Sequence, residues 1–99
     1  MKAINTVGTR KSAVARATLT AGSGIVRVNS LLLSNFTPSM YKLRIQEPLL
    51  LAGDSAKNVN IRVNVYGGGI KSRSDAARLA VAKALASYDK KLHKVFLDY

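Results

Sequence analysis

The stretch from Val59 to Gly69 constrains the fold more than any other part of the chain. Apolar and polar residues alternate from Val59 to Tyr66, which is typical of a strand that is buried on one face. The consecutive glycines Gly67, Gly68 and Gly69 interrupt this pattern, and an alanine-rich segment with helical periodicity then runs to about Tyr88. The sequence therefore predicts a strand, a flexible loop and a helix in direct succession.

A basic glycine loop in front of a helix can bind a phosphate group. Lys71 and Arg73 lie beside the glycines, and glycine lets backbone N–H groups approach an anion closely. The start of a helix adds free N–H donors and partial positive charge. We expect Ser72 to cap this helix and Asp75 to be its acidic partner three residues later. The same glycines are also typical of a tight strand-to-helix turn, so the pattern alone leaves both interpretations open.

The net charge indicates the kind of partner. The chain has 99 residues, with 16 Lys and Arg against 5 Asp and Glu, and a formal net charge of +11. A domain this basic repels itself unless a polyanion neutralises it, and nucleic acid is the commonest such partner. A membrane surface is the alternative, but no basic amphipathic segment carries bulky Trp, Phe or Leu along one face. Hydrophobic residues make up 47% of the chain, so we expect one folded domain over residues 1–99.

Several classes of site are disfavoured by the residues present. The chain has no cysteine, which excludes disulfides and thiolate metal sites. The single histidine, His93, lies among Lys90, Lys91 and Lys94, which disfavours a bound metal. No Ser-His-Asp set or close carboxylate pair emerges, so we expect no enzyme activity, no cofactor and no small-molecule substrate. The sequence shows neither a signal peptide nor an apolar run long enough to span a bilayer, and we expect a soluble cytoplasmic protein.

The remaining segments indicate an α+β layout. Strands are expected over residues 3–7, 12–20 and 25–28, with Gly8 at a turn or bulge. A hairpin turn over 21–24 would pair the third strand back along the second. We expect a helical turn over 31–33, a helix that starts at Thr37–Pro38 and kinks or restarts at Pro48, a loop over 53–58, and a last helix over 90–98.

The apolar residues indicate how these elements pack. One face of the second strand would be buried, with Val14, Arg16 and Thr18 on the other face. Met40, Leu43 and Leu49–Leu51 would form the buried stripe of the first helix, and the last helix would pack through Leu92, Val95 and Phe96. We expect the core to include Leu43, Leu50, Ile61, Val63, Val65, Val81, Leu85 and Phe96.

The basic residues concentrate at loops and on polar strand faces. Arginine binds phosphate through a bidentate fork, whereas lysine acts as a point charge. Arg16, Arg27 and Arg62 project from strand faces that carry no large apolar residues, whereas we expect the lysines near residue 90 to be ordinary solvated charges. Tyr66 is the only aromatic residue beside a basic loop, which disfavours a stacking platform for bases. The expected RNA-binding residues are Arg10, Lys11, Arg16, Arg27, Gly67, Gly68, Gly69, Lys71 and Arg73.

Five blocks along the chain resemble, in order, ribosomal protein nine of the small subunit: Gly8–Ala17, Gly22–Asn29, Glu47–Leu49, Gly67–Gly69 and Asp75–Leu85. The stretch Tyr41–Pro48 is most similar to the archaeal and eukaryotic branch of that family. The resemblance implies a two-layer α+β sandwich like the second domain of ribosomal protein five. Such a domain has a four-stranded mixed sheet, helices on one face and a left-handed crossover. It also implies a structural constituent of the small subunit, with ribosomal RNA of the head (3′ major domain) and neighbouring head proteins as partners.

Two departures from the family pattern bear on function. Ser72–Arg73 stands where the family has a Gly-Gln pair, and the arginine adds a further group that can bind phosphate. The family continues into a long basic tail that reaches the peptidyl-site tRNA, whereas these 99 residues end at Asp98–Tyr99, so the resemblance does not carry a direct tRNA contact over to them. Two alternatives stay open: an RNA-binding domain outside the ribosome, and an enzyme of the small-molecule kinase type, which would need a longer loop and acidic metal ligands.

Overall fold

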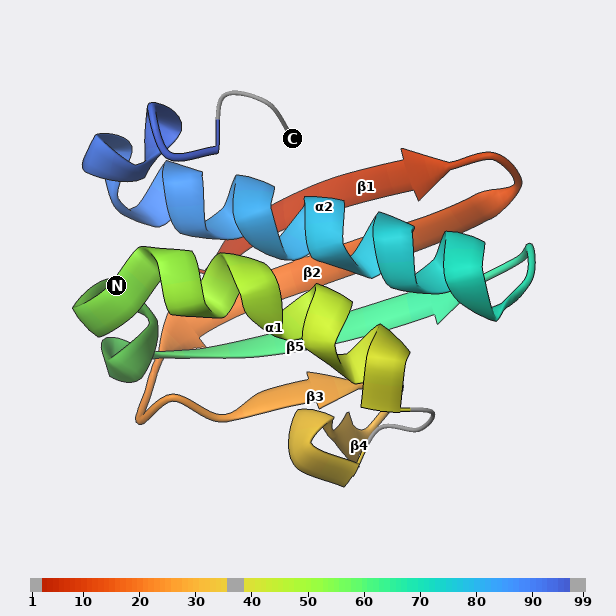
Figure 1. Cartoon of the computed structure of the whole chain (residues 1–99). Coiled ribbons are helices and arrows are strands. Elements are labelled where there is room, and N and C mark those ends of the chain that lie inside the picture. Colours follow the sequence, from red (N-terminus) through yellow and green to blue (C-terminus); the bar gives the residue numbers. More distant parts are fainter. Residues whose placement is uncertain (1–2, 36–38, 97–99) are drawn as a thin grey trace.

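The computed structural model describes residues 3–35 and 39–96 and shows an α+β domain with one mixed sheet (Figure 1). Two helices cover one face of the sheet, and the opposite face, which we call the open face, carries no helix among the described residues. The strand order is β1-β2-β5-β3-β4. The strands are β1 (Ile4–Arg10), β2 (Ala13–Ala21), β3 (Val26–Val28), β4 (Leu31–Leu32) and β5 (Val59–Tyr66). The helices are α1 (Ser39–Ala52) and α2 (Ile70–Tyr88), with 3-10 turns η1 (Leu33–Asn35), η2 (Gly53–Asn58) and η3 (Lys90–His93).

The sheet differs from the expected one in strand number and pairing. The described residues form five strands rather than four, because Leu31–Leu32 pairs with β3 as a short strand and not as a helical turn. The expected hairpin between residues 12–20 and 25–28 is wrong, since β5 lies between β2 and β3 and pairs antiparallel with the first and parallel with the second. Asn60 on β5 fixes this arrangement by accepting hydrogen bonds from the backbone N–H groups of Ser23 and Ile25, each at 3.0 Å.

The connection between the parallel strands β3 and β5 passes through α1. In Figure 1 both strands run from left to right, α1 lies in front of the sheet, and β5 lies above β3. A chain that moves from β3 to β5 by this route makes a left-handed crossover, which is rare because strand twist favours the right-handed form. Helix α2 then runs back over the same face of the sheet (Figure 1).

Small residues let α2 pack directly on the sheet. Helix α2 buries alanines against β1 and β2. On β2, the buried face consists of Ala13, Ala15, Ala17 and Leu19, as the alternation predicts. At Gly8 the backbones of β1 and α2 come close together, because a Cβ there would clash with the backbone of Ala76 and Ala80. The expected turn or bulge at Gly8 is therefore wrong. The residue lies inside β1 and lacks a side chain because the helix backbone occupies that space.

Helix α1 buries a different face from the expected one. Ile45, Pro48 and Ala52 face the core, whereas Leu43 and Leu50 are 61% and 78% exposed, so their placement in the core is wrong. The expected stripe of Met40, Leu43 and Leu49–Leu51 is wrong because apolar residues occur on every side of this helix, and their spacing alone does not show which side is buried. The helix continues through Pro48 without the expected restart, and the expected start at Thr37–Pro38 lies outside the described residues.

The C-terminal segment packs partly as expected. Leu92 and Phe96 are buried against the core, as predicted, but Val95 is exposed. The segment begins as the 3-10 turn η3, where the Asp89 carboxylate accepts a hydrogen bond from the Lys91 backbone N–H at 3.1 Å. The end of the expected last helix, at Asp98, lies outside the described residues.

Candidate nucleic-acid interface

The glycine loop between β5 and α2 needs glycine for two different reasons. Gly67 and Gly68 have φ values of 78° and 63°, in the left-handed region that favours glycine. A Cβ on Gly67 would also clash with the carbonyl oxygen of Ser12 in the β1–β2 turn. Gly69 instead has φ −89° and open space around its missing side chain. Chain geometry thus explains Gly67 and Gly68, whereas Gly69 leaves the approach to the helix start unobstructed.

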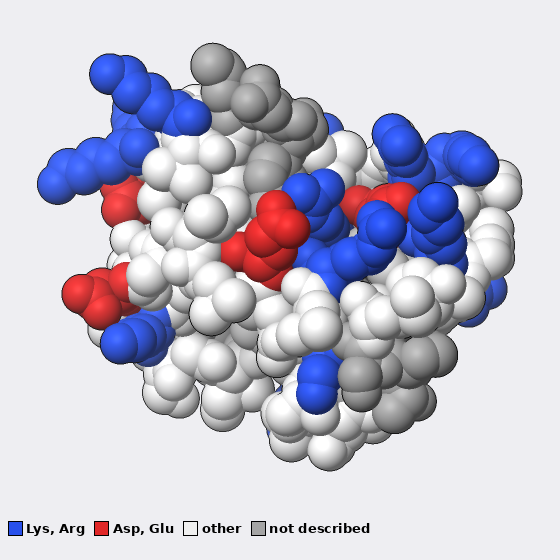
Figure 2. Space-filling view, viewed as in Figure 1, with Lys and Arg blue, Asp and Glu red and all other residues white. Residues whose placement is uncertain are grey.

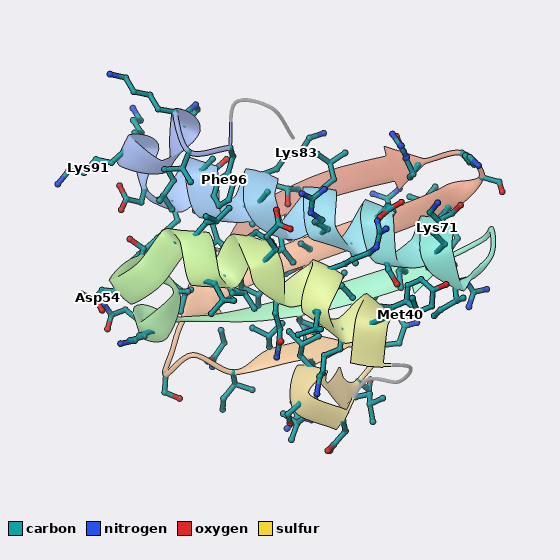
Figure 3. The ribbon with its side chains drawn as sticks, viewed as in Figure 1. Met40, Asp54, Lys71, Lys83, Lys91 and Phe96 are labelled. Carbon is teal, nitrogen blue, oxygen red and sulfur yellow. The ribbon has the colours of Figure 1, made fainter. Side chains whose placement is uncertain are left out.

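The β1–β2 turn lies directly against this loop, through the contact between Gly67 and Ser12. The turn presents Arg10 and Lys11 to solvent, and Lys11 adopts a left-handed φ of 53°. Figure 3 shows Lys71 at the first turn of α2, at the same end of the sheet as the β1–β2 turn. The fold thus brings together one exposed cationic surface, which we call the glycine-loop end: Arg10, Lys11, Gly67, Gly68, Gly69, Lys71 and Arg73.

The start of α2 differs from the expected capping box. The N-cap is Gly69, no side chain caps it, and the first turn contains no acidic residue. Ser72 is therefore inside the helix. Asp75 forms an ion pair with Arg44 on α1, at 2.8 Å, and does not act as the acidic partner in a capping box. The partial positive charge of the helix start is left uncompensated by acids in the first turn, which suits an anionic ligand.

Arg73 has a structural contact in addition to its exposure. Its Nε donates a hydrogen bond to the carbonyl oxygen of Gly67 at 3.0 Å, which ties the helix start to the loop. Arg10, Lys11 and Lys71 make no such contact within the described residues. These three side chains are therefore the most available to an external phosphate.

Arg16 and Arg27 do not belong to the glycine-loop end. They lie on the open face, where Arg27 is the register partner of Arg62 in the parallel β3–β5 pair. Arg62 was absent from the expected binding set, although the alternation along β5 places it on the polar face with Asn60 and Asn64. Its position next to Arg27 could not be found from sequence, because it depends on β5 pairing with β3.

Two arginines on the helix side are neutralised by acids of the neighbouring helix. Arg44 pairs with Asp75 and Arg78 with Glu47, at 2.8 and 2.7 Å, and both pairs connect α1 to α2. Figure 2 shows acidic and basic atoms side by side over the middle of this face, with further basic atoms toward its ends. The charge available to a polyanion therefore lies away from the middle of the helix face.

Two other kinds of site are absent from the described residues. Within residues 3–35 and 39–96, no three His, Cys, Asp or Glu side chains come together as metal ligands. None of the helices in this same part of the chain is long and apolar enough to cross a membrane.

Comparisons with known proteins agree with the resemblance in the sequence. The family model described as ribosomal protein S9/S16 matches residues 8–98. The small ribosomal subunit protein uS9 of Methanococcus maripaludis is 42% identical over 101 aligned positions, which cover 100% of this chain and 75% of the relative. The uS9 proteins of Thermoplasma acidophilum (42% over 96 positions; 95% and 74% covered) and Methanothrix thermoacetophila (33% over 101 positions; 100% and 76% covered) are also similar.

Proposed function

Because this chain belongs to the ribosomal protein S9/S16 family, whose members are structural and non-enzymatic components of the small ribosomal subunit, we propose that it binds ribosomal RNA of the subunit head. The contact would be made with backbone phosphates of the 3′ major domain. Family membership also confirms that the chain is not an enzyme and that it acts in the cytoplasm on the ribosome.

The observation that carries this proposal is the convergence of two distant segments at the glycine-loop end. The β1–β2 turn supplies Arg10 and Lys11, and the start of α2 supplies Lys71 together with an uncapped helix N-terminus. Both segments are anchored to the rigid sheet, so binding RNA requires little ordering of the protein. Neutralising RNA phosphates releases counterions, which supplies much of the affinity.

Finer features of the family are part of the same proposal. We assign the fold to the class of the second domain of ribosomal protein five, on the basis of the helix layer on one face and the crossover through α1. Residues 1–99 would form a single RNA-binding domain. Neighbouring head proteins would meet the helix side, where the arginines are paired and Leu43 and Leu50 are exposed.

The test is the salt dependence of binding to an RNA fragment of the small-subunit head. Log affinity should fall linearly with log salt, with a slope of about −0.7 to −0.9 per neutralised phosphate. A nearly flat dependence would contradict binding through phosphates. Co-sedimentation with small subunits separates this function from the alternative of an RNA-binding domain outside the ribosome, which would bind RNA without entering the subunit.

A further inference from the structure

The open face carries a cluster of three arginines that lies apart from the glycine-loop end. Arg62 lies on β5, the central strand of the described sheet, and Arg27 is its direct neighbour on β3. Arg16 on β2 pairs with Asn64 and is therefore diagonal to Arg62 on the same face. The register thus brings Arg16, Arg27 and Arg62, which come from three different strands, onto one surface, which we call the open-face cluster.

This cluster contains like charges that no acidic side chain of the described residues neutralises. Of the five Asp and Glu residues, Asp98 lies outside the described part, and the other four lie on α1, η2, α2 or directly after α2. Within the described residues, the side chains of Arg16 and Arg62 make no hydrogen bond or ion pair, and the Arg27 side chain has only a 3.4 Å contact with the Ser30 carbonyl oxygen. Like charges at neighbouring positions across strands are unfavourable. An external anion would remove this repulsion.

The surface beside Arg27 and Arg62 is shaped to receive such a group. A hollow of about 270 Å³ lies between them and is bounded by hydroxyl and amide side chains as well as by the two arginines. A water molecule occupies roughly 30 Å³ in the liquid, so the hollow has room for a phosphate group with its oxygens. Asn60 keeps one rim in place through its two hydrogen bonds to the turn after β2. The lining residues are Thr18, Thr20, Ile25, Arg27, Asn60, Ile61 and Arg62.

We propose that the open-face cluster is a second RNA-binding surface, which holds phosphodiester groups independently of the glycine-loop end. This inference rests on the proposed function, because it takes RNA as the partner. Arg62 lies five residues before Gly67 on an extended strand, which separates the two surfaces by roughly 17 Å. The open-face cluster lies on the face of the sheet opposite the helices, whereas the glycine-loop end lies at one end of the strands. The protein therefore holds RNA at two places.

A double variant tests the contribution of the cluster. Arg27→Gln/Arg62→Gln should lower affinity for a head fragment of small-subunit RNA by about 10- to 100-fold and reduce the salt slope by about 1.4 to 1.8, the value for two phosphates. The matched control Lys90→Gln/Lys94→Gln removes the same charge from exposed positions near η3 and should change both quantities far less. The melting temperature of the double variant without RNA should not fall, because the substitution removes repulsion. Unchanged RNA affinity and salt slope would overturn the proposal. A variant that keeps its RNA affinity but no longer binds an acidic protein would overturn it as well.

Directed cleavage of RNA separates the two surfaces. The chain has no cysteine, so Thr20→Cys beside the hollow and Gly69→Cys at the loop each give one attachment point for an iron chelate that generates hydroxyl radicals. We expect the two positions to cleave different places in the RNA. Cleavage from Gly69→Cys alone would overturn the open-face inference and leave the proposed function standing. Cleavage from Thr20→Cys alone would support the inference and contradict the glycine-loop end as a binding site. No cleavage from either would contradict both.

Discussion

The two faces of the sheet use arginine in opposite ways. On the helix side, Arg44 and Arg78 each meet a carboxylate of the neighbouring helix, so their charge contributes to holding α1 against α2. On the open face, Arg16 and Arg62 meet no carboxylate within the described residues. The same side chain is therefore structural on one side and available to a partner on the other. What decides the role is the distribution of the few acids, none of which lies on a described strand.

The largest effect should come from the helix-covered face of β1. Gly8→Val would place a branched side chain against the backbone of α2, which cannot yield as a flexible side chain would, and we expect a loss of about 3 kcal/mol or more in unfolding free energy. Thr9→Val, on the open face of the same strand, should change stability by less than about 0.5 kcal/mol. Urea denaturation of both variants checks this. Equal stability of the two would mean that α2 does not press on β1.

The next largest effect concerns binding at the glycine-loop end. Arg10→Gln/Lys11→Gln/Lys71→Gln should weaken RNA binding by about 100-fold and reduce the salt slope by about 2 to 3, since three phosphate contacts are lost. Stability should stay within about 0.5 kcal/mol, because these exposed side chains make no hydrogen bond or ion pair within the described residues. Lys90→Gln/Lys91→Gln/Lys94→Gln is the charge-matched control. An equal loss in both triple variants would show that net charge alone drives binding.

Replacement by alanine should affect stability differently at two glycines of the same loop. Gly67→Ala combines a left-handed φ with a clash against the Ser12 carbonyl and should cost roughly 1–3 kcal/mol of stability. Gly69→Ala has an ordinary φ and open space, and its effect on stability should be below about 0.5 kcal/mol. Thermal melts measure this difference, and RNA titration of the stable Gly69 variant then tests whether a phosphate approaches there. A Gly67 variant as stable as the parent would refute the close contact between the loop and the β1–β2 turn.

A smaller effect should distinguish arginines on the two faces. Arg44→Ala breaks the pair with Asp75, whose side chain is only 15% exposed, and should cost about 0.5–1 kcal/mol of stability without changing RNA affinity. Arg16→Ala should leave stability unchanged and weaken RNA binding. Parallel denaturation and RNA titration of the two variants are the measurement. If both variants lost stability, or if both lost RNA affinity, the arginines of the two faces would not have different roles.

The smallest effect concerns acid stability at Asp89. The Ser55 hydroxyl, the Lys91 backbone N–H and the Lys91 charge together hold the pKa of this carboxyl below its ordinary value, with the hydrogen bond from Ser55 as the largest cause. A lowered pKa means that the folded state is favoured when the carboxyl is charged. This stabilisation is present above the unfolded pKa of about 4 and is lost as pH falls through the folded value.

Asp89→Asn should therefore reduce stability near pH 7 and make it less dependent on pH in the acid range. Ser55→Ala should show the same trend more weakly, because it leaves the contacts with Lys91 in place. Melting temperatures measured from pH 7 down to about 2 check both variants. If the melting temperature of Asp89→Asn fell as steeply with decreasing pH as that of the parent, the Asp89 carboxyl would be excluded as the cause of the acid destabilisation.

Local patterns were sufficient where burial follows a simple period. The alternation along 13–19 and 59–65 identified two strands and the residues that they bury, and the alanine-rich segment after the glycines forms α2 up to Tyr88 as predicted. The excess of cations and the resemblance to ribosomal protein nine also identified the family. The basic residues of the glycine-loop end are exposed beside loops, as their positions in the sequence indicated, whereas the contact between Gly67 and Ser12 that brings them together comes from the fold, and their binding to RNA stays a prediction.

Features that depend on distant neighbours were decided only by the tertiary structure. A turn over 21–24 is compatible with a hairpin, and nothing local shows that β5 enters between β2 and β3 and thereby places Arg62 beside Arg27. Helix α1 is apolar on every side, so only the alanine surface of α2 and the sheet select Ile45 over Leu43 for burial. Gly8 reads as a turn until α2 is seen to occupy the place of its side chain. In each case the deciding contact joins residues far apart in the chain, and a local pattern carries no information about them.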